Sequence, residues 1–223
     1  MTIILLSSFA TAWYLPAHYY EFEDVTRDNC LLAGCDNASL SPINGPTYAT
    51  GKIGKAIDCE EGSSQYLINS SYPVPSAIKT IEFWAKPENP TYTNYPRPLQ
   101  LGDAAAHSYS WDIMATNTQS ITSRMRFGGA TIWTIASADT WTDGQWTHII
   151  MSKNVSHYNL FINGTLTGSA ANTQELDGNF TDFNICRRQD NQAYWDGLVD
   201  NVALFEDSYS GKNASDSYNN GAG

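Results

Sequence analysis

Residues 144–168 read GQWTHIIMSKNVSHYNLFINGTLTG, and the alternation of their side chains decides the fold class. Residues 146–153 carry apolar side chains on both faces, which is typical of a strand inside a layered structure. A second strand is predicted over 158–162. It ends at Asn163-Gly164, two residues that tolerate the positive φ angles of a type I′ turn. The stretch therefore predicts strands joined by turns, including one tight hairpin.

Trp146 and His148 stand two residues apart in this stretch and raise the question of a site. His148 is a candidate base or metal ligand, but no serine, cysteine or second histidine accompanies it at a plausible local spacing. A hydrogen-bonded structural histidine is therefore the favoured interpretation. Trp146 is predicted to be a core residue rather than a platform for a sugar, because its neighbours alternate as core residues do.

Strand-like segments recur along the rest of the chain, and turn residues separate them. They are predicted at 18–23, 54–59, 65–69, 80–86, 110–115, 121–127, 131–136, 165–169, 181–186 and 197–205. Helical periodicity is weak over any long window. Many short strands at this spacing predict an all-β sandwich or barrel. Similar strands follow the Pro-rich run 87–98, so one domain is expected over 13–221, and the tail SYNNGAG is expected to fray.

The formal net charge is −11 and the isoelectric point is about 4.6. An acidic surface repels polyanions, which excludes nucleic acid as a partner and leaves neutral glycans, cations and proteins. No stretch approaches the roughly 20 apolar residues that a membrane helix needs, so no membrane span is expected.

Asn-x-Ser/Thr sequons are frequent and indicate a secreted or surface glycoprotein. They place candidate glycosylation sites at Asn37, Asn69, Asn154, Asn163, Asn179 and Asn213. The expected location is extracellular, or at a cell or virion surface. Asn163 is a special case because it also forms the predicted hairpin turn.

The chain has four cysteines and no CxxC motif, a pattern that does not favour zinc. In an extracellular chain two disulfides are the default. Cys30 and Cys35 bracket a short loop and are predicted to pair, which leaves Cys59 with Cys186. Four cysteines allow three connectivities, so the other pairings stay open.

The first twelve residues, MTIILLSSFATA, allow two interpretations. They are apolar and end in small residues, as the remnant of a signal peptide would, although a positively charged start is missing. Residues 2–6 can also form a first β-strand.

Several motifs follow one another in a characteristic order. HYYEFED (18–24) ends in acidic residues, and GKIGKAIDCEEGSSQYL (51–67) combines Gly-x-x-Gly-x-Ala with a later glycine turn. TIEFWAKP (80–87), the opening stretch, and FNIC with YWDGLVDNVALF (183–205) complete the set. Together they resemble the laminin-G-like, concanavalin A-like jelly-roll domains, which occur as lectin and carbohydrate-binding modules in secreted and cell-surface proteins.

The resemblance covers about residues 18–221 and implies two antiparallel sheets packed face to face in a jelly-roll sandwich. Within it, residues 88–135 match nothing in the family and are expected to supply loops that set specificity. Cys186 stands where the family commonly has glycine, which supports a disulfide there.

Domains of this family often hold one structural Ca²⁺, an ion that takes six to eight oxygen ligands from carboxylates and carbonyls. The resemblance implies Glu23 or Asp24, the carbonyl of Gly62, and Asp200 as its ligands. Asp200 has two alternative interpretations, a solvated strand end or an isolated hydrogen-bond acceptor.

Catalysis is not expected. Glycoside hydrolysis uses two carboxyl groups about 5.5 Å apart or wider, which suggests acidic residues at alternate positions of one strand. The sequence has no Glu-x-Asp-x-Glu, and Glu21-Phe-Glu23-Asp24 comes closest, at a terminal strand away from where such folds place their cleft. No lyase motif of His or Tyr with Arg and Gln is recognisable.

A glycan-binding module is the first functional hypothesis, because sugar sites combine an aromatic face with planar polar side chains. The candidate ligand-binding residues are Tyr92, Tyr95, Trp111, Trp133 and Trp141, with Asp112, Asn117 and Arg126 as polar partners. The alternative for the three tryptophans is a place in the core.

The second hypothesis is a structural or adhesive subunit of an extracellular filament, cell envelope or virion surface. The apolar residues 1–15 motivate it, because an unpaired strand can complete a neighbour's sheet and produce a homo-oligomer. Under either hypothesis the partner is a glycan or an extracellular protein.

Overall fold

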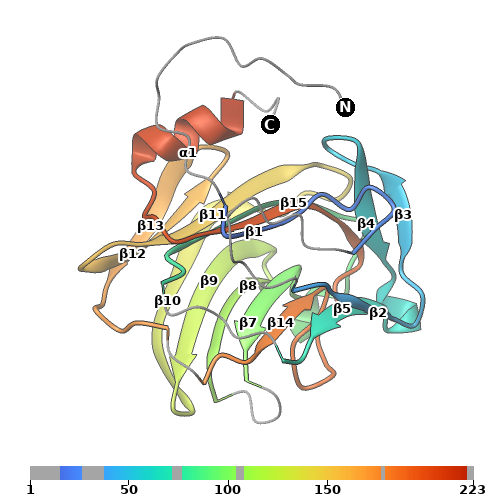
Figure 1. Cartoon of the computed structure of the whole chain (residues 1–223), viewed down its shortest axis with the longest axis horizontal. Helices are drawn as coiled ribbons and strands as arrows, with labels where there is room; N and C mark the ends of the chain where they lie inside the picture. Colours follow the sequence, from blue (N-terminus) through green and yellow to red (C-terminus); the bar gives the residue numbers. More distant parts are fainter. Residues whose placement is uncertain (1–15, 27–37, 72–76, 104–107, 177–178, 220–223) are drawn as a thin grey trace.

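The computed structural model describes residues 16–26, 38–71, 77–103, 108–176 and 179–219. Within these residues two antiparallel sheets form a sandwich (Figure 1). The predicted all-β sandwich of two antiparallel sheets is confirmed.

The first sheet has eight strands. In spatial order they are β13 (Thr165–Ala171), β12 (His157–Ile162), β11 (Thr147–Lys153), β6 (Thr80–Pro87), β15 (Gly197–Phe205), β4 (Lys55–Cys59) and β3 (Thr47–Thr50), with β1 (His18–Tyr20) paired to β15. The strands β11 and β12 come from the opening stretch, and β6 from TIEFWAKP. The family-like motifs therefore build the centre of this sheet.

The second sheet has seven strands. In spatial order they are β10 (Ala130–Thr140), β9 (Ser120–Phe127), β8 (Ser110–Ala115), β7 (Leu99–Gly102), β14 (Asp182–Ile185), β5 (Tyr66–Asn69) and β2 (Ser41–Ile43). Pro42 lies in β2 at the edge of the sheet, a position where a strand can accommodate a missing N–H donor.

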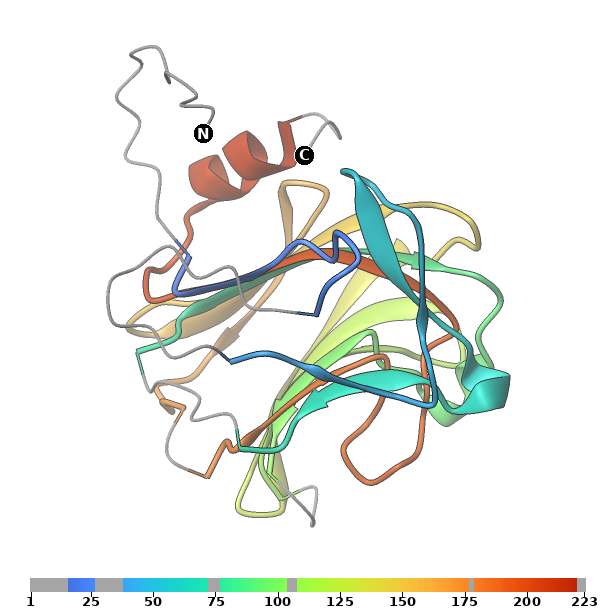
Figure 2. The same ribbon diagram turned by 45° about the vertical axis from the view of Figure 1, so that its right-hand side comes forward.

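The two sheets face each other (Figure 2), and the buried residues of the hydrophobic core come from strands of both. Tyr158 of β12 packs against Trp111 of β8, with ring centroids 5.4 Å apart, and against Trp133 of β10, at 4.7 Å. Side chains from the two sheets thus interlock, because alternate residues of every strand point inward.

The tight turn between β12 and β13 has the geometry that the sequence predicts. Asn163 and Gly164 both have positive φ, at 48° and 75°. The side-chain oxygen of Asn163 also accepts the backbone N–H of His148 at 3.0 Å, which ties the hairpin to β11. The predicted hairpin is confirmed.

Helix α1 (Gly211–Tyr218) lies on the outer side of the eight-stranded sheet (Figures 1 and 2). It begins with a capping box between Ser210 and Asn213, and Ala214 packs against Ile150 and Phe161. This helix is not predicted from the sequence, and the prediction that residues 217 and 218 fray is wrong, because both belong to α1. Strands β2, β3 and β7 were also missed.

His148 and Trp146 project to the same outer side of the sheet. His148 Nε2 lies 2.8 Å from Glu82 Oε1, and its ring centroid lies 4.7 Å from that of Trp84. His148 is therefore a hydrogen-bonded, buried side chain, as predicted. Trp146 is half-buried beside Lys86, whose Nζ lies 5.8 Å from the ring centroid, so its prediction as a core residue is wrong.

A disulfide joins the two sheets. Cys59 ends β4 and Cys186 follows β14; both are fully buried, and their Cα atoms lie 6.4 Å apart. This confirms the predicted Cys59–Cys186 pair.

Cys30 and Cys35 lie outside the described residues, as do Asn37 and the segment 1–15 with its predicted signal remnant or strand. In the part of the chain that is described, no helix has the length and apolarity to span a bilayer.

Candidate functional site

The three tryptophans predicted to stack on sugars are in the core. Trp111 and Trp141 are 1% exposed and Trp133 is 7% exposed. Trp111 and Trp133 contact Tyr158 between the sheets, and Trp141 packs edge-on against Trp195 at 4.9 Å. Rings enclosed in this way offer no face to a sugar, so their prediction as stacking platforms is corrected.

The polar candidates are not brought together either. Asn117 is exposed in the turn before β9, whereas Arg126 lies near the opposite end of that strand and donates to the Gly129 carbonyl at 2.6 Å. Asp112 is fully buried. Tyr95 is 41% exposed and is the predicted aromatic that presents its ring to solvent.

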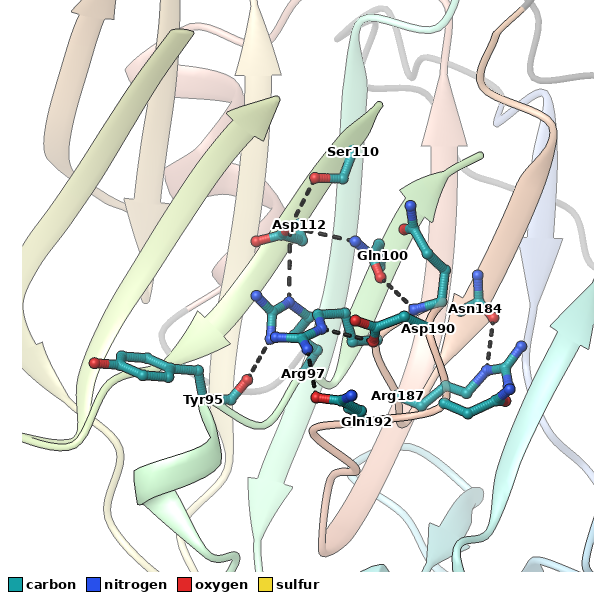
Figure 3. Close-up of polar contacts among 12 residues, drawn as sticks. Tyr95, Arg97, Gln100, Ser110, Asp112, Asn184, Arg187, Asp190 and Gln192 are labelled. Carbon is teal, nitrogen blue, oxygen red and sulfur yellow. Dashed lines mark hydrogen bonds and ion pairs between the residues drawn. The ribbon is translucent and has the colours of Figure 1, made fainter. Parts of the chain in front are cut away.

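Asp112 is the centre of a polar network on the outer face of the seven-stranded sheet (Figure 3). Its Oδ2 accepts from Ser110 Oγ at 3.0 Å, from Gln100 Nε2 at 3.3 Å and from Arg124 Nη2 at 3.1 Å, and Arg97 Nε lies 3.6 Å away. These side chains face away from the core because Leu99, Leu101, Trp111 and Ile113 of the same strands face into it. A buried carboxylate is stable here because donors and cations surround it.

The loop 186–196 covers this network. Gln189 donates its backbone N–H to Gln100 Oε1 at 2.8 Å, and its side chain donates to the Tyr109 carbonyl at 3.2 Å. Gly102 makes room for that side chain, because a Cβ at Gly102 would lie 2.1 Å from Gln189 Oε1. The loop is thus seated on the sheet by specific polar contacts.

Arg97 joins two loops at the end of the sheet. Its Nη1 donates to the Tyr95 carbonyl oxygen at 2.5 Å, and its backbone N–H donates to the Ala193 carbonyl oxygen at 3.2 Å. Both partners have positive φ, 55° at Tyr95 and 52° at Ala193, which is uncommon for residues other than glycine. The two loops therefore meet at Arg97, which contacts one through its side chain and the other through its backbone N–H.

Both segments joined by Arg97, together with the 3-10 helix 61–63, line a pocket of about 280 Å³. Its lining residues are Glu61, Asn94, Gln192, Ala193 and Tyr194. The short 3-10 helices Glu61–Ser63 and Tyr92–Asn94 supply Glu61 and Asn94, and the loop 186–196 supplies the rest. Glu61 Oε2 accepts the Thr91 N–H at 2.6 Å, which links these two helices.

One wall of the pocket is aromatic and preorganised. The ring of Tyr194 lies 6.1 Å from that of Tyr66, and the Arg187 guanidinium carbon lies 3.7 Å from the Tyr66 ring centroid. Arg187 in turn donates to Asn184 Oδ1 at 2.9 Å. Such cation–π and hydrogen-bond contacts fix the ring of Tyr66 and, through it, the position of Tyr194.

Burial lowers the pKa of Arg97 to about 10, and Asp112 opposes that shift. Arg97 therefore stays protonated at neutral pH. The pocket lining combines two amide side chains, one carboxylate and one tyrosine. Such a combination of polar groups and an aromatic ring suits a polyhydroxylated ligand.

Sequence reasoning missed the lining residues Glu61, Asn94, Gln192 and Tyr194. Two signals point toward them. The run TYTNYP (91–96) places two tyrosines and an asparagine in one loop, and RRQDNQAYW (187–195) is a polar loop with aromatic residues directly after a cysteine. Only the fold shows that these two loops meet.

The family model described as the concanavalin A-like lectin/glucanases superfamily (Laminin_G_3) matches residues 61–214, more than half of the chain. The chain belongs to this family. The match runs through 88–135, the segment for which the sequence analysis found no counterpart. Comparison with curated proteins found no significant match.

Solved structures of this concanavalin A-like type resemble the chain over most of its length. Domain 4 of AbnA, an extracellular arabinanase from Geobacillus stearothermophilus solved in complex with arabinotriose, superposes with a TM-score of 0.74 at 18% identity, over 91% of this chain and 98% of that domain. The binding domain of Paraclostridial Mosquitocidal Protein 1 superposes with a TM-score of 0.65 at 18% identity, over 92% of this chain. At these identities the likeness shows the fold.

A third structure is the binding domain of botulinum neurotoxin DC in complex with SialylT, with a TM-score of 0.65 at 12% identity. The chain covers 50% of that domain and 52% of the mosquitocidal one. This concanavalin A-like chain thus spans about half the length of the toxin binding domains.

The residues implied as Ca²⁺ ligands do not form one site. Asp200 is buried, and its Oδ2 accepts the N–H groups of Lys52 and Ile53 at 2.8 and 3.0 Å. Glu23 Oε1 accepts the Lys55 N–H at 2.9 Å, in the same turn between β3 and β4. Both carboxylates are thus used as acceptors for backbone donors, which is one of the alternatives stated for Asp200.

Asp24 forms an ion pair with Lys55, and Gly62 lies beyond the opposite end of β4. At about 3.3 Å per residue, the five residues of β4 alone place Gly62 more than about 13 Å from the β3–β4 turn. In the described part of the chain, no three His, Cys, Asp or Glu side chains gather as metal ligands. Calcium binding by Asp200 with Glu23 or Asp24 stays a prediction.

The sequon asparagines of the described residues differ in how their amides are used. Asn154 Oδ1 accepts the N–H groups of Ser156 and His157, and Asn69 Oδ1 accepts that of Ser71. Asn213 belongs to the capping box of α1. Asn163 and Asn179 are exposed. Glycosylation of these positions stays a prediction.

Proposed function

We propose that this chain is a non-catalytic, extracellular glycan-binding module and that the pocket lined by Tyr194 is its binding site. The observation that carries this proposal is the pocket itself. Three chain segments supply amide, carboxylate and aromatic side chains to one cavity, and Arg97 joins two of these segments through its side chain and its backbone N–H.

The chemistry of the lining supports a glycan ligand. Sugars present hydroxyl groups, which donate to carboxylate oxygens and both donate to and accept from amides such as those of Asn94 and Gln192. They also present apolar C–H faces, which stack on aromatic rings; Tyr194 lines the pocket, and the exposed Tyr95 follows the lining residue Asn94 in the chain. A preorganised site of this kind loses little entropy when a ligand binds.

A binding role without catalysis is supported by the carboxylate arrangement. Glu61 is the one carboxylate among the described pocket-lining residues, and its Oε2 is held by the Thr91 N–H. Hydrolysis of a glycosidic bond uses a second carboxyl group across the scissile bond. Two of the similar solved structures are binding domains by their descriptions, and the domain of the arabinanase was solved in complex with arabinotriose.

An extracellular location is supported by the buried Cys59–Cys186 disulfide, since stable disulfides form mainly in oxidising compartments. The acidic surface excludes polyanionic partners but not neutral sugars.

A glycan array probed with the wild-type chain tests this function, alongside Tyr194→Ala, Tyr95→Ala and Leu166→Ala. Leu166 is 52% exposed on β13, the edge strand of the eight-stranded sheet far from β4, and serves as the matched control. We expect binding by wild type and Leu166→Ala, and a loss of about tenfold or more in Tyr194→Ala and Tyr95→Ala, since stacked rings contribute strongly to sugar affinity. Wild type that binds no glycan contradicts the function.

A further inference from the structure

Carboxylates gather at one end of the eight-stranded sheet, next to the pocket. Strands β4, β15 and β6 are neighbours there, because Gly197 pairs with Cys59 on one side and with Pro87 on the other. The acidic residues at these strand ends are Asp58, Glu60, Glu61, Glu88 and Asp196. We refer to these five residues as the acidic edge. Glu61 belongs both to this edge and to the pocket lining.

The members of the acidic edge influence one another. The Glu88 N–H donates to the Asp196 carbonyl at 2.9 Å, which brings these two residues together. Burial, followed by repulsion from Glu60 and Glu61, raises the pKa of Asp196 to about 6. Burial, followed by repulsion from Glu88 and Glu60, raises the pKa of Asp58.

Three positive charges near the pocket are paired with carboxylates. Lys86 forms an ion pair with Glu88 at 2.8 Å. Behind the pocket, Arg97 lies 3.6 Å from Asp112, and Arg188 Nε lies 2.7 Å from Asp190. An incoming anion would therefore meet the carboxylate of Glu61 in the lining, while Lys86, Arg97 and Arg188 are held by carboxylates of their own. Arg187, beside Tyr66, donates instead to the amide oxygens of Asn184 and Asn191.

Building on the proposed function, we propose that Glu61 and the acidic edge restrict this pocket to uncharged glycans and reject glycans that carry uronic or sialic acid. Glu61 accepts hydroxyl hydrogens from a neutral sugar, whereas it repels a second carboxylate at the same distance. Like-charge repulsion at a binding site is an efficient means of specificity, because it penalises one ligand without weakening the other.

An array that prints each neutral oligosaccharide beside a counterpart bearing a uronic or sialic acid tests this inference. The proteins are wild type, Glu61→Gln and Glu206→Gln. Glu206 is exposed just beyond the opposite end of β15, so its substitution removes the same charge far from the pocket. We expect wild type to bind the neutral member roughly tenfold more tightly, and Glu61→Gln to narrow this ratio while Glu206→Gln leaves it unchanged. Added salt should also narrow the wild-type ratio.

The outcomes separate the two proposals. Binding of the acidic member as tightly as the neutral one overturns this inference and leaves the glycan-binding function standing. A ratio that is the same in Glu61→Gln and wild type overturns the role of Glu61. Absence of binding to both members overturns the function and this inference with it.

Discussion

The guanidinium of Arg97 donates from Nη1 to the carbonyl oxygen of Tyr95 at 2.5 Å, beneath the one predicted aromatic that presents its ring to solvent. The same residue donates its backbone N–H to Ala193, in the other loop of the pocket. The buried side chain of Arg97 therefore holds the loop at Tyr95, and its backbone N–H joins that segment to the loop at Ala193.

Replacement of Arg97 by lysine should weaken glycan binding by about tenfold, because the loop at Tyr95 loses the Nη1 hydrogen bond and must be ordered when the ligand binds. Lysine keeps the positive charge beside Asp112 but lacks the planar fork of donors. Isothermal titration calorimetry with the tightest array glycan measures the affinity, and near-ultraviolet circular dichroism checks the fold.

Arg124→Lys is the matched control for that experiment. Arg124 also contacts Asp112, at 3.1 Å, but it lies on β9, outside both pocket loops. Its substitution should leave the affinity within about twofold of wild type. Equal losses in Arg97→Lys and Arg124→Lys would show that the general network, rather than the contacts of Arg97 with the loops, supports the pocket.

The Cys59–Cys186 disulfide should contribute about 2–5 kcal/mol to the free energy of unfolding, because it closes a long segment of chain. Its sequence separation is 127 residues, and it joins the two sheets. Urea unfolding of a Cys59→Ala/Cys186→Ala variant measures the loss. A midpoint equal to that of wild type would mean that packing alone holds the sheets together.

The central strands could be predicted from the sequence because local pattern and tertiary role agree there. Residues 147–153 and 157–162 alternate over a full strand length, and Asn163-Gly164 requires a turn that few dipeptides allow. The buried Cys59–Cys186 pair followed from the short spacing of the other two cysteines.

In the shorter elements, the local sequence pattern does not indicate the structure that the chain adopts. Strand β2 has three residues and contains a proline, and β7 follows the Pro-rich loop. Helix α1 is only eight residues long and polar, so its stability comes from the capping box and from Ala214 packing on the sheet rather than from an apolar periodicity.

The candidate site was harder to predict because aromatic residues serve the core and sugar stacking equally well in sequence. Trp111, Trp133 and Trp141 alternate with polar residues on strands or follow one, and only the register shows that they face inward. The pocket depends on contacts between Arg97 and Ala193, which are distant in sequence. No local pattern reports such a contact.

The pKa of Asp196, raised to about 6, makes stability depend on pH in a defined direction. In the unfolded chain an aspartate titrates near 3.9, so between about pH 4 and pH 6 the folded state binds a proton that the unfolded state does not. The contribution of Asp196 to stability is therefore greatest below about pH 4 and is lost as the pH rises through 6. Asp200, whose pKa burial also raises to about 6, acts in the same direction.

Asp196→Asn should accordingly raise the melting temperature at pH 7.5 and change it little at pH 4. Glu61→Gln should have a smaller effect of the same sign, since Glu61 is one of the charges that repel Asp196. Thermal unfolding across this pH range measures both, with Glu206→Gln as the control. A decrease in melting temperature at pH 7.5 for Asp196→Asn would contradict the assignment.

Calcium should have no effect on the melting temperature, because the oxygens of Asp200 and Glu23 that face the β3–β4 turn accept backbone N–H groups. Thermal unfolding in millimolar Ca²⁺ and in EDTA compares the two conditions. Stabilisation by Ca²⁺ that disappears in Asp200→Asn would contradict this placement and support the ligand set expected from the family.

The central claim is that a glycan binds in the pocket between the loop 186–196 and the two short 3-10 helices. Titration of the isotope-labelled chain with the tightest array glycan, followed by backbone amide chemical shifts, tests it most directly. The account predicts that the largest shift changes cluster at Glu61, Asn94, Gln192, Ala193 and Tyr194. Changes confined to the outer face of the eight-stranded sheet, or no changes with any glycan, would contradict it.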